Sequence, residues 1–139
     1  MNKQIFLDTS YVLALVNTKD EFHSVAETLS DKITNRVVTT EAILMEIGNA
    51  LAKVQWRSLS VDTIEDLRDD PEIEIVPVSS ELFSKAFNLY KSRMDKDWGL
   101  TDCISFVVMK ERKLTEVLTT DHHFEQAGFK ALLRRKLGK

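Results

Sequence analysis

The sequence predicts an α/β protein, a sandwich of helices around a parallel sheet. Two observations support this prediction. Short apolar runs typical of buried strands alternate along the chain with longer segments whose apolar residues recur at helical spacing. In addition, 43% of the 139 residues are hydrophobic and 29% are charged, with only four glycines and two prolines, which leaves little room for linkers or disorder. We therefore expect residues 1–139 to form one domain.

The first elements expected are two strands with two helices between them. Residues 4–7 form a short apolar run that fits a buried strand, and a helix is expected to follow over 11–16. A second helix is expected over 22–29, since four apolar residues there share one helical face. Residues 36–39, with two adjacent valines and a threonine, predict the second strand.

The middle of the chain begins with a well-marked helix. Thr40 is a good N-cap for a helix over 41–55, because apolar residues recur there at helical spacing. Ser60 is expected to cap the next helix, which should end at the Asp-Asp-Pro sequence of residues 69–71 because proline cannot continue a helix. Residues 72–78 first alternate and then become apolar, which predicts the third strand.

The last part of the chain contains the most apolar helix. Ser79 or Ser80 is expected to cap a helix through 83–94, and a polar loop with a glycine then leads to residues 102–112. Those residues are apolar on nearly every side, which is typical of a helix in the middle of a molecule. The remaining expected elements are a fourth strand over 116–120, a short helix over 121–128 and a fifth strand over 129–133.

Charge and cysteine content restrict the functions open to the chain. A net charge of -3 provides no general attraction to nucleic acid, so binding of a polyanion would need a metal or a local basic patch. Arg134, Arg135 and Lys136 lie in the one basic segment, which is either a solvated tail or an arm that contacts phosphates. The lone Cys103 excludes an internal disulfide, and there is no signal peptide or long apolar run, so we expect a cytoplasmic protein without membrane contact.

Four acidic residues are candidates for a common site. Asp8 ends the first expected strand and Asp121 follows the fourth, so a parallel sheet would bring both carboxylates to one edge, where ligands bind in such folds. Asp102 lies in the first turn of the most apolar helix. Glu46 lies inside the first long helix, where it shares a face with Asn49.

Each of these acids also has an ordinary structural role open to it. Asp8 and Asp121 are good helix N-caps, Asp102 complements a helix dipole, and Glu46 suits a solvated helix face. Carboxylates that cluster at one edge, however, repel one another unless a cation lies among them. Hard divalent ions such as Mg²⁺ or Mn²⁺ prefer oxygen ligands of this kind, so the pattern favours a metal site.

Four segments resemble the PIN domain family, and within it the VapC-like toxin ribonucleases. They are "FLDTSYVLAL", "TTEAILMEIGNAL", "DWGLTDCISFVVM" and "VLTTDHHFEQAGF", and they cover nearly the whole chain in the order and spacing of the family. The resemblance implies a three-layer α/β/α sandwich with a mostly parallel, about five-stranded sheet. It also implies Mg²⁺- or Mn²⁺-dependent endonucleolytic cleavage of single-stranded regions of RNA.

The resemblance also implies roles for individual residues. Asp8 and Asp102 match the usual direct metal ligands, and Glu46 and Asp121 match the acids that complete the pocket, directly or through water. All four acids are thus candidates for both catalysis and metal binding. The residues that match positions lining the pocket are Thr9, Ser10 and Asn49.

Partners follow from the same resemblance. Toxins of this family are held inactive by a cognate antitoxin protein and commonly form homodimers, so we expect both kinds of partner beside the RNA substrate. The alternative is a non-catalytic PIN-like module that binds RNA or protein. Such members usually lose acids, and here all four are present, which favours the enzyme.

Two histidines and two tryptophans near these motifs have simpler interpretations. His122 and His123 invite a zinc site, but the sequence has no cysteine pair, so a polar helix start is the preferred interpretation. Trp98 is expected to pack on the core. Trp56 could line a groove for RNA or for a partner, and the sequence does not separate these two alternatives.

Overall fold

The computed structural model describes residues 3–137, and five parallel strands form its single sheet in the order β3-β2-β1-β4-β5. The strands are β1 (Ile5–Leu7), β2 (Val37–Thr40), β3 (Ile73–Val76), β4 (Glu116–Leu118) and β5 (Lys130–Ala131). The helices are α1 (Thr9–Val16), α2 (His23–Lys32), α3 (Glu41–Ala50), α4 (Val54–Asp69), α5 (Ser80–Ser92), α6 (Leu100–Glu111), α7 (His122–Gln126) and α8 (Leu132–Leu137).

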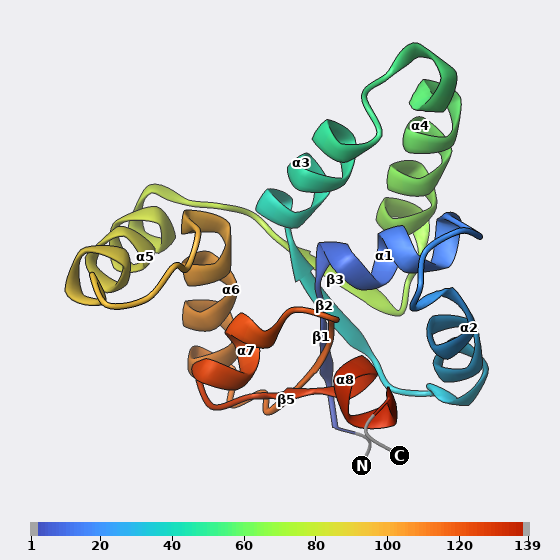
Figure 1. Ribbon diagram of the computed structural model, residues 1–139. Helices are drawn as coiled ribbons and strands as arrows, with labels where there is room; N and C mark the ends of the chain where they lie inside the picture. The colour runs from blue at the N-terminus through green and yellow to red at the C-terminus, as the bar shows by residue number, and fades with distance from the viewer. Residues whose placement is uncertain (1–2, 138–139) are drawn as a thin grey trace.

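The sheet is covered on both faces. Figure 1 shows α5 and α6 on one side and α1, α2 and α4 on the other, which gives three layers. Strand β1 lies at the centre and is buried along its whole length, as a continuous apolar run in a parallel sheet should be. No helix within residues 3–137 is both long and apolar enough to span a bilayer. The predicted α/β sandwich on a parallel sheet is confirmed.

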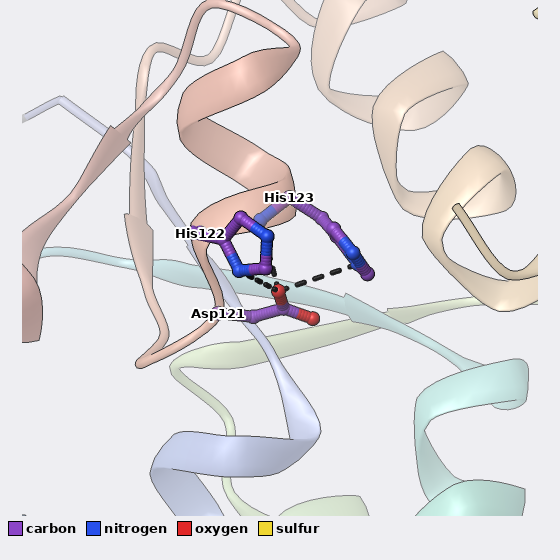
Figure 2. A group of neighbouring side chains, drawn as sticks. All are labelled: Asp121, His122 and His123. Carbon is purple, nitrogen blue, oxygen red and sulfur yellow. Dashed lines mark hydrogen bonds and ion pairs between the residues drawn. The ribbon is translucent and has the colours of Figure 1, made fainter. Parts of the chain in front are cut away.

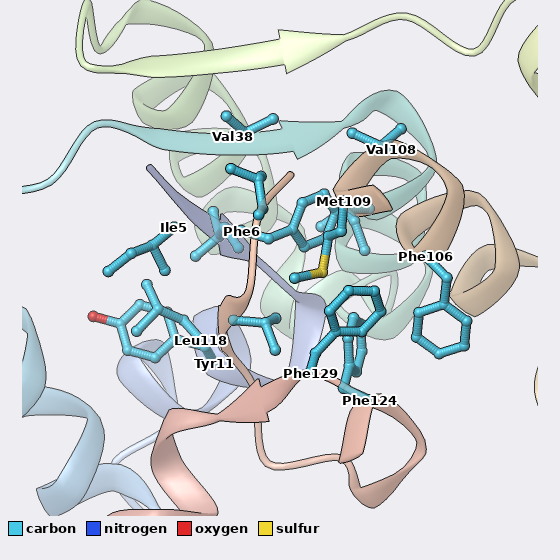
Figure 3. Close-up of a cluster of buried hydrophobic side chains, with 14 of the residues drawn as sticks. Ile5, Phe6, Tyr11, Val38, Phe106, Val108, Met109, Leu118, Phe124 and Phe129 are labelled. Atoms are coloured by element: carbon cyan, nitrogen blue, oxygen red, sulfur yellow. The ribbon is translucent and has the colours of Figure 1, made fainter. Parts of the chain in front are cut away.

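The core is richest in aromatic side chains between the sheet and α6 (Figure 3). Phe106 of α6 meets Phe124 of α7 edge to face, with ring centroids 5.0 Å apart at 88°, and Phe124 in turn contacts Phe6 of β1. Met109 is fully buried beside them. This confirms that the helix predicted from residues 102–112 lies in the middle of the molecule, and the packing of Phe106 and Met109 fixes the helix that carries Asp102.

The predicted helix over 41–55 is wrong at its C-terminal end. Helix α3 ends at Ala50. Arg57 then donates to the carbonyl of Ala52 through Nε (3.1 Å) and Nη2 (2.7 Å), so this carbonyl in the turn between α3 and α4 has hydrogen-bond partners. The chain then reverses so that α4 packs back on α3, where Gly48 lies against Ile64. Val54 fitted the helical spacing in the sequence but is 93% exposed.

The predicted caps are confirmed at two positions and wrong at a third. The Oγ1 atom of Thr40 accepts from the N–H of Ile43, and Oγ of Ser79 accepts from that of Leu82. Ser60 caps nothing, because α4 begins six residues earlier and buries Ser60 in its interior. The turn at residues 51–53 contains no glycine or proline. The sequence therefore contains a clearer signal for a helix that starts at Ser60 than for one that starts at residue 54.

The predicted fifth strand over 129–133 is shorter than expected. Strand β5 comprises only Lys130–Ala131, and Leu132 begins helix α8. Leu133 is fully buried, so the interpretation of this segment as a solvated tail is wrong up to that residue at least. The side chains of Arg135 and Lys136 lie outside the described residues.

Candidate functional site

The buried carboxylate of Asp8 lies at the C-terminal edge of the sheet between two neighbouring strands. Strands β1 and β4 pair in parallel with Leu7 opposite Leu118, so Asp8 comes next to Thr119. Thr119 Oγ1 and Ser10 Oγ both donate to Oδ2 of Asp8, at 2.7 and 2.9 Å. Asp8 is only 6% exposed and makes no N-cap hydrogen bond to α1, so the simple capping role is excluded.

Burial makes the charge of Asp8 costly. Removal from water raises the pKa of its carboxyl from an ordinary 3.8 to about 6, against the opposing effect of hydrogen bonds from Thr119 and Ser10. The negative charge of Glu46 raises it further. Asp8 therefore carries a charge that the folded protein disfavours and that a bound cation would stabilise.

Glu46 reaches the same edge from helix α3. Thr9 Oγ1 donates to its Oε1 at 2.6 Å, which ties the first turn of α1 to α3. Partial burial raises the pKa of Glu46, and the nearby charges of Asp102 and Asp121 raise it further. Glu46 is therefore part of the acidic group and not a solvated helix residue.

Asp102 points back over the start of α6. Its Oδ2 accepts from the backbone N–H of Gly99 at 3.0 Å, so it does stabilise the helix N-terminus as the ordinary interpretation required. Burial nevertheless raises the pKa of Asp102, helped by the charges of Asp121 and Asp8, while His123 opposes the shift. The helix cap and the acidic group thus share one carboxylate.

Asp121 is the N-cap of α7, as its ordinary interpretation predicted. Its Oδ1 accepts from the backbone N–H of His123 at 2.9 Å. Figure 2 shows this carboxylate between the two imidazole rings that follow it in the chain. Its charge raises the pKa of both Glu46 and Asp102, so it belongs to the same electrostatic group as the other three acids.

Sequence reasoning missed Thr119, whose hydroxyl donates to Asp8, and it missed His123. Its Nδ1 lies 3.1 Å from Oδ2 of Asp102 and 3.3 Å from Oδ1 of Asp121, so its side chain joins two of the acids. The backbone of His123 does lie at the start of a short helix, as predicted, but the prediction assigned no role to its side chain. Asp121, His122 and His123 each offer one ligand atom, and these atoms lie within 4.8 Å of one another. Of the two imidazoles, His122 is the more distant, because its Nδ1 lies 3.7 Å from Oδ1 of Asp121 and its side chain is 56% exposed. The adjacency of these three residues in the sequence was the signal that could have indicated a ligand group.

The four carboxylates together suit a divalent cation. Asp8, Glu46 and Asp102 all have raised pKa values, and in each case another acid of the group contributes to the shift. A hard cation such as Mg²⁺ prefers carboxylate oxygens and would relieve this repulsion. The donor set therefore fits a divalent metal.

Other predicted site residues lie elsewhere. Asn49 is exposed and lines a depression between α3 and α4 with Met45 and Arg68. Arg134 forms an ion pair with Glu125 at 2.9 Å and donates to the carbonyl of Thr120 at 3.4 Å, close to the strand tip that carries Asp121. Neither residue makes its contacts with the four acids themselves.

The two tryptophans differ in environment. Trp98 is buried, packs edge to face on Phe106 and donates through Nε1 to Gln126 at 2.9 Å. The prediction that Trp98 packs on the core is confirmed. Trp56 is 44% exposed and lines a depression between α1, α3 and α4, so a partner surface remains open to it.

Comparison with known proteins gives a consistent result. Residues 5–130 match the family model described as the PIN domain. The 23S rRNA-specific endonuclease VapC20 of Mycobacterium tuberculosis is 26% identical over 125 residues, which span 90% of this chain and 95% of that protein.

Solved structures with the same fold include three of particular interest. The crystal structure of Mycobacterium tuberculosis VapC20, described as a sarcin-ricin loop cleaving toxin, has a TM-score of 0.84 at 25% identity and covers 90% of this chain and 95% of its own. VapBC2 from Rickettsia felis, bound to a promoter DNA fragment, has a TM-score of 0.65 at 14% identity and covers 92% and 96%. FitAcB from Neisseria gonorrhoeae has a TM-score of 0.63 at 19% identity and covers 91% and 94%.

Proposed function

This chain belongs to the PIN domain family, and we propose that it is a metal-dependent endoribonuclease that cleaves single-stranded regions of RNA. One observation carries the proposal. Carboxylates from four separate elements meet at one sheet edge, and three of them have pKa values raised partly by the charge of another. A structural cluster of this kind would cost stability, whereas a metal centre would require it.

We assign the four acids to different tasks in this reaction. Asp8 and Asp102 hold the divalent ion, Mg²⁺ or Mn²⁺, while Glu46 and Asp121 orient the attacking water or hold a second ion. A bound divalent ion supplies Lewis-acid stabilisation of the phosphoryl group and lowers the pKa of a water ligand. The hydroxyls of Thr9, Ser10 and Thr119 keep Glu46 and Asp8 in position, since each donates to one of these two carboxylates.

The first RNA to test is suggested by the relatives. VapC20 is described as specific for 23S rRNA and as cleaving the sarcin-ricin loop, so the corresponding rRNA fragment is a reasonable first substrate. Because the chain has a net charge of -3, RNA must be held by the metal and by local cations. Arg134, Arg135 and Lys136 are the candidates that we propose for phosphate contacts.

We further propose that the protein is a toxin with a cognate antitoxin. The similarity to VapC20, described as a toxin, supports this. A toxin needs a neutralising partner, and the depression between α1, α3 and α4 offers an apolar surface for one. Its apolar lining includes Leu13, Val16, Leu51, Trp56 and Leu59.

The second partner that we propose is another copy of the chain, packed on helix α5. Phe83, Phe87 and Tyr90 lie in a row on its exposed face, with successive ring centroids 6.2 Å apart. Met94, two residues beyond the end of the helix, is also exposed. A contiguous aromatic face of this kind is typical of a protein interface. Sedimentation of the wild type and of Phe87→Glu would test this, with a dimer expected only for the wild type.

Cleavage of end-labelled RNAs tests the activity. The panel includes the 23S rRNA fragment and single-stranded controls, each incubated with Mg²⁺, Mn²⁺ or EDTA. We expect wild-type cleavage to require the ion and Asp8→Asn to be inactive. Asp62→Asn, which makes the same chemical change on the exposed face of α4, is the matched control and should cleave normally. A folded wild type that binds metal but cleaves none of these RNAs would favour the non-catalytic binding module.

A further inference from the structure

Helix α7 brings an imidazole to the acidic site, in addition to the carboxylates. Nδ1 of His123 lies 3.1 Å from Oδ2 of Asp102 and 3.3 Å from Oδ1 of Asp121, and the side chain is 20% exposed. The adjoining Phe124 is fully buried in the core, and the N–H of His123 is bonded to Asp121. The backbone of His123 is therefore fixed by the hydrogen bond to Asp121 before it and by the buried Phe124 after it, and this holds the ring at the site.

The separations between these atoms match neighbouring ligands on one small ion. Two ligand atoms that each lie about 2.1 Å from a divalent ion are about 3.0 Å apart at a right angle and about 3.4 Å apart at a tetrahedral angle. The distances of 3.1 and 3.3 Å fall inside this interval. The corresponding distance from Nδ1 of His122 to Oδ1 of Asp121 is 3.7 Å and falls outside it.

We propose that His123 is a nitrogen ligand of the metal centre and that it makes the site prefer a first-row transition ion, such as Mn²⁺ or Co²⁺, over Mg²⁺. This rests on the proposed function for the position of the metal centre. The four carboxylates alone suit Mg²⁺ well, because Mg²⁺ takes oxygen ligands and water. One imidazole among them shifts the preference, since nitrogen ligands bind transition ions more strongly than Mg²⁺.

A hydrogen-bonding role for His123 would give the same distances. In that case an imidazole N–H donates to Asp102 and Asp121 and only positions them. The substitution His123→Asn separates the two roles, because the asparagine amide still offers an N–H donor near the same place but does not bind a metal through nitrogen. His122→Asn makes the same change on the neighbouring residue, whose side chain is 56% exposed, and is the matched control.

Two measurements test the proposal. Calorimetric titration with Co²⁺ and with Mg²⁺ compares the wild type with both variants. We expect His123→Asn to bind Co²⁺ at least about tenfold more weakly while its Mg²⁺ affinity changes less than about threefold. His122→Asn should bind both ions like the wild type. Pulsed electron paramagnetic resonance of the Mn²⁺-loaded wild type should show hyperfine coupling to a nitrogen nucleus, and His123→Asn should lose it.

Three results would overturn the proposal. They are no nitrogen coupling in the wild type, unchanged Co²⁺ affinity in His123→Asn, or a loss of Co²⁺ affinity in His122→Asn as large as that in His123→Asn. The wild-type spectrum needs no variant, so an absence of nitrogen coupling overturns the proposal even if His123→Asn does not fold. Where coupling is present, its retention in His122→Asn assigns the nitrogen to His123. RNA cleavage with Mg²⁺ is measured separately. If wild-type protein shows nitrogen coupling but cleaves no RNA, the ribonuclease proposal fails and the nitrogen ligand stands.

Discussion

The two aspartates at the tips of β1 and β4 look alike in the sequence but are held differently. Asp121 is 30% exposed and accepts a backbone N–H as the N-cap of α7. Asp8 is 6% exposed, makes no side-chain cap hydrogen bond to α1, and accepts hydrogen bonds from two hydroxyls, while burial raises its pKa to about 6. Position after a strand therefore does not reveal the role of an aspartate. The hydrogen-bond donors around it do: a backbone N–H marks a helix cap, and side-chain hydroxyls mark a buried charge that suits a ligand.

The largest effect expected from this comparison is on catalysis. Asp8→Asn keeps an oxygen that can accept from Ser10 and Thr119 but removes the charge that holds the ion. We expect RNA cleavage to fall by on the order of 10³-fold, as when a group that stabilises transition-state charge is lost. Rates measured with saturating Mn²⁺ check this. Retention of more than a tenth of the activity would mean that Asp8 does not hold the metal.

A pH dependence of stability follows from the same residue. Asp8 has an ordinary pKa of 3.8 and about 6 when folded, so between these pH values the folded state binds more protons than the unfolded state. The free energy of unfolding should therefore decrease as pH rises from about 4 to about 6 and change little above that, by up to about 3 kcal/mol for this group.

Urea unfolding in EDTA across this pH range measures the effect. Glu46 and Asp102 also have raised pKa values and act in the same direction. In Asp8→Asn the decrease should be smaller, and at pH 7 this variant should be more stable than the wild type. Identical pH profiles for the two proteins would show that the charge of Asp8 is not destabilising.

At the other strand tip we expect a capping effect. Asp121→Ala removes the acceptor for the N–H of His123 and should lower the free energy of unfolding by about 1 kcal/mol, whereas Asp121→Asn keeps the cap and should cost little. Thermal unfolding in EDTA compares the two variants. If both destabilise equally, the charge at this position contributes more than the cap does.

The smallest effect concerns the cation next to that tip. Arg134 pairs with Glu125, and both side chains are partly exposed. Arg134→Ala should therefore change the free energy of unfolding by less than about 0.5 kcal/mol, since exposed ion pairs contribute little. A proposed phosphate contact predicts weaker RNA binding that depends on salt. Fluorescence anisotropy with a labelled RNA at two salt concentrations measures this binding. If Arg134 serves only in the ion pair with Glu125, Arg134→Ala should bind RNA like the wild type at both concentrations.

Much of the fold and half of the site could be predicted from local patterns. The apolar runs that became β1, β2 and β4 were recognisable, and parallel pairing then placed Asp8 and Asp121 at one edge. His123 could not be assigned this way, because its contact with Asp102 depends on how α6 and α7 pack against each other. The end of α3 was missed because the turn before Val54 lacks glycine and proline, and its position depends on packing of α4.

The central claim is that the edge of the sheet is a metal centre and that the buried charge of Asp8 destabilises the protein without the metal. Comparing metal binding by the wild type and by Asp8→Asn tests this claim most directly. Calorimetric titration with Mn²⁺ at pH 7.5 gives the affinity of each, and urea unfolding in EDTA gives their stabilities. We expect Asp8→Asn to be the more stable protein and to bind Mn²⁺ at least about tenfold more weakly. Equal affinity for Mn²⁺ in the two proteins would contradict the proposed metal centre.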